Sequence, residues 1–177
     1  MSDTSLYILI ICTFANSIFS WNYSLKAKRL HGIPRFFAFE CILLLALLNV
    51  SVWFEQPLKW NQIISWILLV TSIPCAVAGF LLLRFVGKPK GDFENTSNLV
   101  VVGLYKFIRH PLYASLMLLG FGIFFKHITI TTNVFAVVNF IMLVATAKSE
   151  EKEMSKKFGE EYADYIKRTK MFIPFIF

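Results

Sequence analysis

Five long apolar runs, separated by short polar segments, constrain the fold of this chain more than any other feature. The runs cover residues 6–23, 36–54, 62–85, 112–125 and 128–147. A helix needs about 20 apolar residues to cross the hydrocarbon core of a bilayer, and every run except the fourth reaches or approaches this length. Apolar residues make up 56% of the 177 residues and charged residues only 16%, so a single soluble core could not bury the apolar surface. The sequence therefore predicts an all-α integral membrane protein with about five transmembrane helices.

We expect a single membrane domain over residues 1–177, built in two parts. Residues 1–86 would supply three N-terminal spans, and residues 87–177 would supply a polar loop, a helical hairpin and an amphipathic C-terminal helix. Gly32 and Pro34 are expected to end any helix in the connector after the first run. Lys126, at the turn of the hairpin, is expected to extend its ammonium group to the membrane interface.

The basic residues predict how the chain is oriented in the membrane. With five spans, 16 of the 18 Lys and Arg residues fall on one side and only Lys59 and Lys126 on the other. The positive-inside rule then places the N-terminus outside and the C-terminus in the cytoplasm. Although the net charge is +7, the basic residues form no basic face or nucleic-acid-binding module, so we expect no nucleic-acid partner. The cysteines and histidines are isolated from one another, which predicts neither a disulfide nor a metal site.

A polar, aromatic and basic segment at residues 103–113 is the first candidate for chemistry. Pro111 suits the first turn of the fourth helix, where its missing N–H costs nothing, so His110 would lie near the N-cap. The free N–H groups, the helix dipole and the charge of Arg109 would attract an anion there. Tyr105 and Tyr113 add two phenols. The same residues would also serve as a basic anchor with interfacial aromatic rings, and both interpretations stay open.

The tail contributes a second candidate. Apolar and aromatic residues recur there at helical spacing: Met154, Phe158, Tyr162 and Tyr165. Continuing this stripe back by four residues reaches Glu150, which is thus predicted to face inward. An inward carboxylate needs a partner, either a ligand or a salt bridge to Arg109 or Lys106. The other carboxylates of this helix are expected to be solvated charges: Glu151, Glu153, Glu160 and Glu161.

Glu40 lies inside the second apolar run, where a carboxylate is costly and faces protein or water. The simpler interpretation is a structural ion pair with Arg35 or Arg84, near the same membrane interface. The alternative is a role in a substrate site.

Several short motifs, taken in order, resemble the isoprenylcysteine carboxyl methyltransferase family, whose wider group includes phospholipid N-methyltransferases. The matching pieces lie between residues 97 and 177 and are Leu99-Val100, Gly103-Leu104-Tyr105, Arg109-His110-Pro111-Leu112-Tyr113, an apolar hairpin, Glu150-Glu151, Phe158-Gly159-Glu160-Glu161-Tyr162, Tyr165 and Ile173-Pro174. The ordered series is specific, whereas any single piece would be weak.

The resemblance implies a methyltransferase with S-adenosyl-L-methionine as methyl donor. Carried over by position, the cofactor contacts would be Ser97, Asn98, Leu99, Val100, Tyr105, His110, Pro111, Leu112, Tyr113 and Glu150. The residues expected to take part in catalysis are Arg109, His110 and Glu150. Glu150 would suit the amine or ribose hydroxyls of the donor, and the tyrosines would shelter its sulfonium, a cation that aromatic faces favour.

The acceptor is less well indicated, because the chain departs from the family pattern at two positions. Thr146 stands where the isoprenylcysteine enzymes have a substrate-contacting arginine, and Ser97 replaces a histidine of their loop. We expect a membrane-associated or lipophilic acceptor with a carboxylate or thiol, since a carboxylate or thiolate needs alignment but no general base. A phospholipid amine is the alternative acceptor. Two other classes stay open, an NADPH-dependent membrane reductase and a membrane protein without enzymatic activity.

Overall fold

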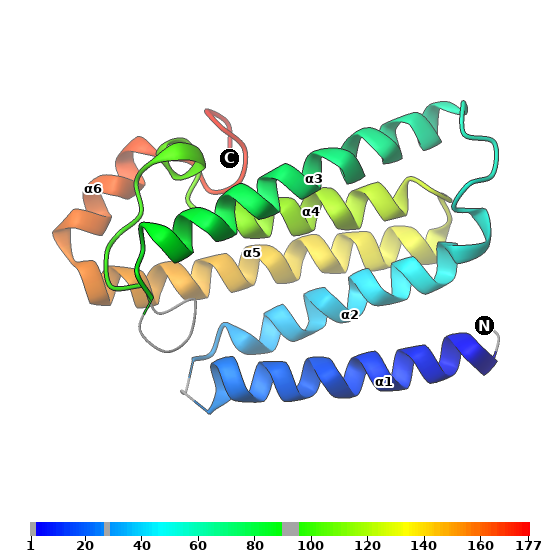
Figure 1. The fold of residues 1–177 in the computed structure, drawn as a ribbon, viewed down its shortest axis with the longest axis horizontal. Helices are drawn as coiled ribbons and strands as arrows, with labels where there is room; N and C mark the ends of the chain where they lie inside the picture. The colour runs from blue at the N-terminus through cyan, green and yellow to red at the C-terminus, as the bar shows by residue number, and fades with distance from the viewer. Residues whose placement is uncertain (1–2, 27–28, 90–95) are drawn as a thin grey trace. The chain divides into compact units, whose positions relative to one another are not determined.

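The structure is a computed structural model, and it describes residues 3–26, 29–89 and 96–177. Figure 1 shows a chain of helices, of which α3 and η3 are separated by a long connection over residues 86–102. In chain order the elements are α1 (Asp3–Ser20), η1 (Trp21–Leu25), α2 (Gly32–Asn49), η2 (Val50–Val52), α3 (Trp60–Phe85), η3 (Gly103–Lys106), α4 (Pro111–Phe124), α5 (Ile130–Phe158) and α6 (Glu160–Arg168).

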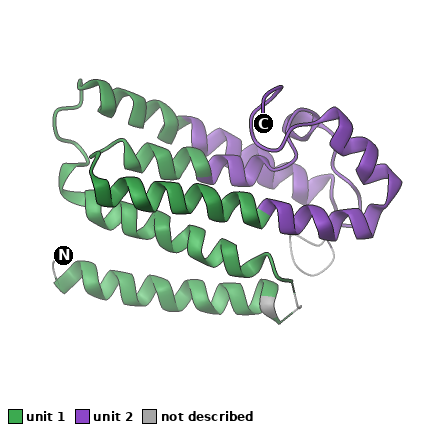
Figure 2. Ribbon diagram, turned by 180° about the vertical axis from the view of Figure 1, so that it is seen from behind, with its two compact units in different colours: residues 1–70, 117–146 green, residues 71–116, 147–177 purple. Residues whose placement is uncertain are grey.

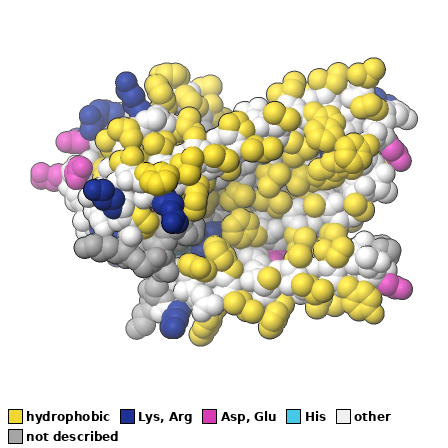
Figure 3. Space-filling model, in the orientation of Figure 1, with side chains coloured by type: hydrophobic (Ala, Val, Ile, Leu, Met, Phe, Trp, Pro, Cys, Tyr) yellow, Lys and Arg dark blue, Asp and Glu magenta, His cyan; other side chains and the backbone are white. Residues whose placement is uncertain are grey.

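The predicted class, an all-α integral membrane protein, is confirmed. Among the described residues four helical segments are long and apolar enough to cross a membrane: Asp3–Ser24, Gly32–Val52, Trp60–Phe85 and Ile130–Phe158. The shorter α4 is also apolar. Large hydrophobic side chains stay exposed along these helices, as with Ile11, Ile67 and Ile130, and they cover much of the surface in Figure 3. Such a surface is stable in lipid rather than in water.

The predicted helix boundary at Gly32 and Pro34 is wrong. These residues begin α2 instead of ending a helix. Proline is tolerated in the first helical turn because the N–H groups there have no partner inside the helix. Gly32 is required by a close approach, since a Cβ at this position would lie 2.3 Å from the Ser24 Cβ.

The tail also differs from the single amphipathic helix that was predicted. Helix α5 runs through the predicted boundary at Lys148 and ends at Phe158. Gly159 has a φ of +55° and a ψ of −125°, a combination that glycine adopts at little cost because it has no Cβ. The chain therefore turns there and begins a separate helix, α6, which buries Tyr162 and Tyr165.

The chain divides into two compact units, coloured separately in Figure 2. Unit 1 comprises residues 1–70 and 117–146, and unit 2 comprises residues 71–116 and 147–177. Helices α3, α4 and α5 each contribute residues to both units.

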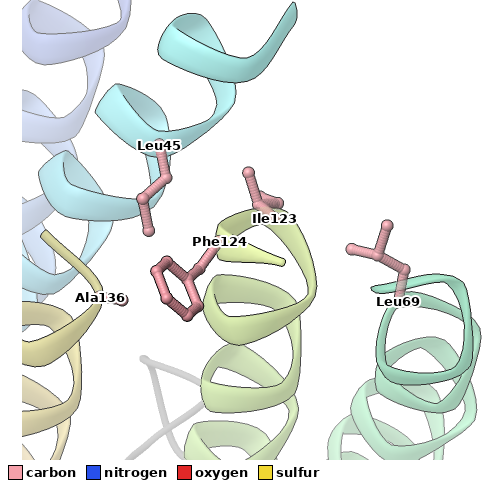
Figure 4. Packing of buried hydrophobic residues seen from close by; sticks show 5 residues of the cluster. All are labelled: Leu45, Leu69, Ile123, Phe124 and Ala136. Carbon is pink, nitrogen blue, oxygen red and sulfur yellow. The ribbon is translucent and has the colours of Figure 1, made fainter. Parts of the chain in front are cut away.

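Unit 1 has a hydrophobic core formed by Leu45, Leu69, Ile123, Phe124 and Ala136. In Figure 4 the Phe124 ring of α4 is directed toward Leu45 of α2 and Ala136 of α5. Leu45 is fully buried, so this core fixes α2 against the hairpin by close packing.

Buried amides join the helices of unit 1 around this core. The Asn139 side chain donates to the carbonyl of Ala38 at 2.9 Å, and the Asn49 side chain donates to the carbonyl of Ile123 at 2.9 Å. Interhelical hydrogen bonds of this kind supplement apolar packing in membrane proteins.

Lys126 does not extend to the interface as predicted. Its side chain is 2% exposed, its Nζ donates to the Gln62 Oε1 at 3.0 Å, and it lies 3.6 Å from the centre of the Trp66 ring. The amide oxygen and the aromatic face replace water around the ammonium group.

Glu40 also has partners other than those predicted. Among the described residues, its carboxylate accepts hydrogen bonds from the Thr13 Oγ1 and the Asn16 Nδ2 of α1, each at 2.7 Å. Arg35 instead donates to the Ser24 Oγ at 2.6 Å. The expected ion pair is therefore replaced by neutral donors from the neighbouring helix.

Candidate functional site

A cavity of about 50 Å³ in unit 2 collects most of the polar residues that the sequence singled out. Its lining comes from the end of α3, the connection before η3, η3 itself, the two residues that precede α4, the end of α5 and α6. The lining residues are Leu83, Thr96, Leu99, Val100, Tyr105, Arg109, His110, Glu150, Met154, Tyr162 and Tyr165.

Arg109 and His110 form one wall of the cavity. Backbone hydrogen bonds to the C-terminal residues Lys170 and Met171 hold this wall in place. The backbone N–H of Arg109 donates to the carbonyl of Lys170 at 2.8 Å, and that of His110 donates to the carbonyl of Met171 at 3.1 Å. Pro111 then begins α4 as predicted. The backbone N–H of His110, beside the predicted anion site at the helix N-terminus, is thus occupied by the protein's own backbone, and so is that of Arg109.

Two basic side chains of this wall, Arg109 and His110, lie close to the carboxylates of Glu150 and Glu151. The Arg109 Nε donates to the Glu151 Oε1 at 2.6 Å, and the His110 Nε2 lies 3.2 Å from the same oxygen. The His110 Nδ1 lies 3.6 Å from the Glu150 Oε2. The imidazole therefore sits between consecutive carboxylates of α5. Arg109 pairs with Glu151 and not with Glu150, for which a salt bridge to Arg109 was one of the alternatives left open.

The electrostatics of this cluster favour a charged His110. Burial by itself would lower the pKa of His110, but hydrogen bonding to Glu150 and Glu151 and the charges of both carboxylates outweigh it and raise the pKa above its ordinary value. The imidazolium form is consequently stabilised. Arg109 adds a further constraint, because its Nη1 donates to the carbonyl of Thr169 at 2.5 Å.

Three tyrosines form the aromatic part of the lining. The Tyr165 hydroxyl donates to the Tyr105 carbonyl at 2.7 Å, and the Tyr105 hydroxyl donates to the Gly79 carbonyl at 3.4 Å. Burial is the main reason that the pKa values of Tyr105, Tyr162 and Tyr165 are raised, and nearby carboxylates raise that of Tyr162 further. All three phenols thus stay neutral over the physiological range.

The structure brings together six of the predicted site residues at this cavity. They are Leu99, Val100, Tyr105, Arg109, His110 and Glu150. Their suggested roles in cofactor binding and catalysis stay predictions.

The other predicted contact residues do not line the cavity. Ser97 and Asn98 are exposed, and their backbone N–H groups donate to the carbonyl of Gly87. Pro111 and Leu112 lie against Gly79 of α3, where a Cβ would lie 3.2 Å from the Pro111 Cβ. Tyr113 is behind the wall, stacked on the His110 ring with centroids 5.6 Å apart.

Sequence reasoning missed Glu151 as a site residue, since it was expected to be a solvated charge. Its side chain is 16% exposed and holds both bases of the cluster. The pair Glu150-Glu151 was a signal that could have found it, because it lies at the end of an apolar run. Tyr162 and Tyr165 were recognised as part of an inward stripe, but their place at the cavity was not predicted.

The donor set fits a ligand that carries a positive charge together with hydroxyl or amine groups. Glu150 supplies a carboxylate, and three neutral phenols supply aromatic faces. The cavity volume of about 50 Å³ is well below the roughly 300–1,000 Å³ of small-molecule sites, so a ligand of nucleoside size fits only after the lining residues move apart. Among the described residues, no group of three His, Cys, Asp or Glu could hold a metal ion.

Comparison with protein families identifies the chain's relationship. A family model described as Protein of unknown function (DUF1295) matches residues 13–169. The chain belongs to the DUF1295 family.

Curated proteins add a more specific similarity. This DUF1295 chain is 38% identical over 74 residues to Methanethiol S-methyltransferase 1 of Bradyrhizobium diazoefficiens, covering 40% of the chain and 24% of that relative. It is 32% identical over 71 residues to Methanethiol S-methyltransferase of Pseudomonas deceptionensis, covering 40% and 26%. It is 35% identical over 74 residues to the Crocosphaera subtropica protein of the same name, covering 41% and 28%.

These similarities cover only about a quarter of the length of the curated relatives. The relatives belong to the isoprenylcysteine carboxyl methyltransferase-like group of membrane methyltransferases, so the resemblance recognised in the sequence is confirmed at the level of that group.

Proposed function

We propose that this protein is an integral membrane methyltransferase that uses S-adenosyl-L-methionine and methylates a thiol acceptor. The observation that carries the proposal is the meeting of Glu150, His110 and three tyrosines at one cavity. The similarity to proteins named methanethiol S-methyltransferase supports the reaction class and favours sulfur over carboxylate or amine as the acceptor atom.

The cofactor would supply an electrophilic methyl group on a sulfonium. Glu150 would accept hydrogen bonds from its amine or ribose hydroxyls, and the rings of Tyr105, Tyr162 and Tyr165 would face its positive charge. His110 would fix the orientation of both carboxylates beside the cofactor, because its two ring nitrogens lie against Glu150 and Glu151. Arg109 would act as a positioning residue, because its Nε donates to Glu151 and its Nη1 donates to the Thr169 carbonyl.

The acceptor needs alignment rather than elaborate proton transfer. The acceptor would react as its thiolate, the proton of the thiol passing to solvent before the acceptor is enclosed. The protein's contribution would then be to exclude water and to hold the sulfur in line with the methyl group. We infer that the acceptor is small or lipophilic and arrives from the bilayer. Following the positive-inside rule, the N-terminus would lie outside, with the cofactor site and C-terminus in the cytoplasm.

Binding is the first test. The protein in detergent would be titrated calorimetrically with S-adenosylmethionine and with S-adenosylhomocysteine, and NADPH would serve as the control for the reductase class. We expect saturable binding of both sulfur compounds and none of NADPH. If neither S-adenosylmethionine nor S-adenosylhomocysteine binds, the proposed function is overturned.

A matched pair of variants tests the site. Glu150→Gln should weaken S-adenosylhomocysteine binding by about tenfold or more, because a charged hydrogen-bond acceptor is lost. Glu160→Gln removes an exposed carboxylate of α6 and should bind as the unmodified protein does. Equal affinities would place the cofactor elsewhere.

The acceptor is tested by transfer of a labelled methyl group. Short alkanethiols, a prenylcysteine analogue and a lipid extract would be compared under the same conditions. We expect the thiols to be methylated most rapidly, whereas label in a phospholipid amine alone would contradict the thiol assignment.

A further inference from the structure

Unit 1 contains a groove of about 420 Å³ between α1 and α2 that has a carboxylate in its wall. The volume falls within the range of roughly 300–1,000 Å³ found for small-molecule sites. The lining residues are Cys12, Ala15, Asn16, Phe19, Phe39, Glu40 and Leu43. Because both helices are long and apolar enough to cross a membrane, a ligand would reach the groove from the lipid.

The charge of Glu40 lacks a cationic counterpart among the described residues. Both of its oxygens accept a hydrogen bond, one from the Thr13 hydroxyl and one from the Asn16 amide. These donors are neutral. The nearby Arg35 packs over the Phe19 ring, 5.1 Å from its centre, and donates to Ser24. A carboxylate in an apolar environment is costly without an opposite charge, so the groove is complementary to a cation.

The rest of the lining is apolar and aromatic. The Phe19 and Phe39 rings lie 6.3 Å apart in an edge-to-face arrangement, and Leu43 and Ala15 extend the wall. Such a wall suits a hydrocarbon chain, and aromatic faces also attract ammonium groups.

We propose that the α1–α2 groove binds a lipophilic amine, with the ammonium group at Glu40 and the alkyl chain along the aromatic and aliphatic wall. This site is separate from the cavity of unit 2 and does not depend on the proposed methyltransferase activity. Hydrogen bonding between helices would account for Thr13 and Asn16, but both donors are neutral, and no cation pairs with Glu40 in the part of the chain that the structure describes.

Photochemical labelling tests the proposal. The full chain in phosphatidylcholine nanodiscs would be irradiated with hexadecylamine carrying a diazirine, and with the matched alcohol of the same chain length. Cross-linked peptides would be mapped by mass spectrometry. We expect the amine to label the groove residues of α1 and α2 about tenfold more than the alcohol does, because only the amine pairs with the carboxylate. Equal labelling by the two probes would identify ordinary lipid contact and overturn the proposal.

Three variants separate charge from folding. Glu40→Gln keeps a hydrogen-bond acceptor but removes the charge, and it should abolish the preference for the amine. Glu55→Gln removes an exposed carboxylate of unit 1 outside the groove and should leave the preference intact. Ala15→Phe keeps Glu40 but fills the groove, so it should also prevent amine labelling. Unchanged amine labelling in either Glu40→Gln or Ala15→Phe would refute the site.

Discussion

The two units of this protein treat buried polar groups in different ways. In unit 1 buried amides donate to backbone carbonyls of neighbouring helices, as Asn139 does to Ala38 and Asn49 to Ile123. In unit 2 the polar groups converge, since Arg109 and His110 share one carboxylate oxygen of Glu151 at the edge of a cavity. Paired amides hold helices together, whereas converging titratable groups in a cavity mark a candidate site of chemistry.

The comparison predicts that damage to the core of unit 1 lowers stability without changing the site. Leu45→Ala should lower the free energy of unfolding by about 3 kcal/mol, because it removes a fully buried side chain and leaves a cavity. Thermal unfolding in detergent would measure the loss, and Leu48→Ala, at an exposed position of α2, is the control. The affinity for S-adenosylhomocysteine should be unchanged. A loss of affinity together with the loss of stability would contradict the contrast drawn between the core of unit 1 and the site of unit 2.

A substitution among Arg109, His110 and Glu151 in unit 2 should lower both the stability of the fold and the affinity for the ligand. Glu151→Gln removes the charge that holds Arg109 and His110, so we expect about 2 kcal/mol of destabilisation together with weaker ligand binding. The same unfolding and calorimetric measurements apply, with Glu161→Gln at an exposed position as the control. If the two variants behave alike, Glu151 is the solvated charge that the sequence suggested.

The buried ammonium group of Lys126 in unit 1 should contribute to the stability of the fold but not to ligand binding. Lys126→Met keeps the aliphatic part of the side chain but removes the contacts with Gln62 and the Trp66 ring. We expect a loss of about 1 kcal/mol, measured against Lys59→Met, which removes an exposed lysine. A gain in stability would mean that the cost of burying the charge exceeds the contacts it makes.

The smallest effect should come from pH. Because the pKa of His110 is raised in the folded protein, the imidazolium stabilises the fold fully below the ordinary value of about 6.5, and this contribution is lost as pH rises through the raised pKa. The unfolding midpoints of the unmodified protein and of His110→Gln should therefore approach each other as pH rises above neutrality. A difference that stays constant across this window would contradict a loss of the His110 proton there.

The helical membrane architecture could be predicted from the sequence, because apolar runs and helix breakers are local signals. The third run, predicted at 62–85, corresponds to α3 at Trp60–Phe85. Pro111 begins α4 as its chemistry requires. The inward direction of Glu150 also followed from helical spacing, since residues four apart share a face.

Partners depend on which segments meet in space, and only the tertiary structure decided them. Consecutive residues of a helix point about 100° apart, so spacing alone assigned Glu151 to solvent while Glu150 faced inward. In the folded protein Arg109 and His110 lie against the end of α5 and engage both carboxylates. The burial of Lys126 and the neutral partners of Glu40 were likewise fixed by packing between distant parts of the chain. The sequence by itself determined where helices form and which faces are apolar, because these are properties of neighbouring residues. The identity of each polar partner is a property of the fold.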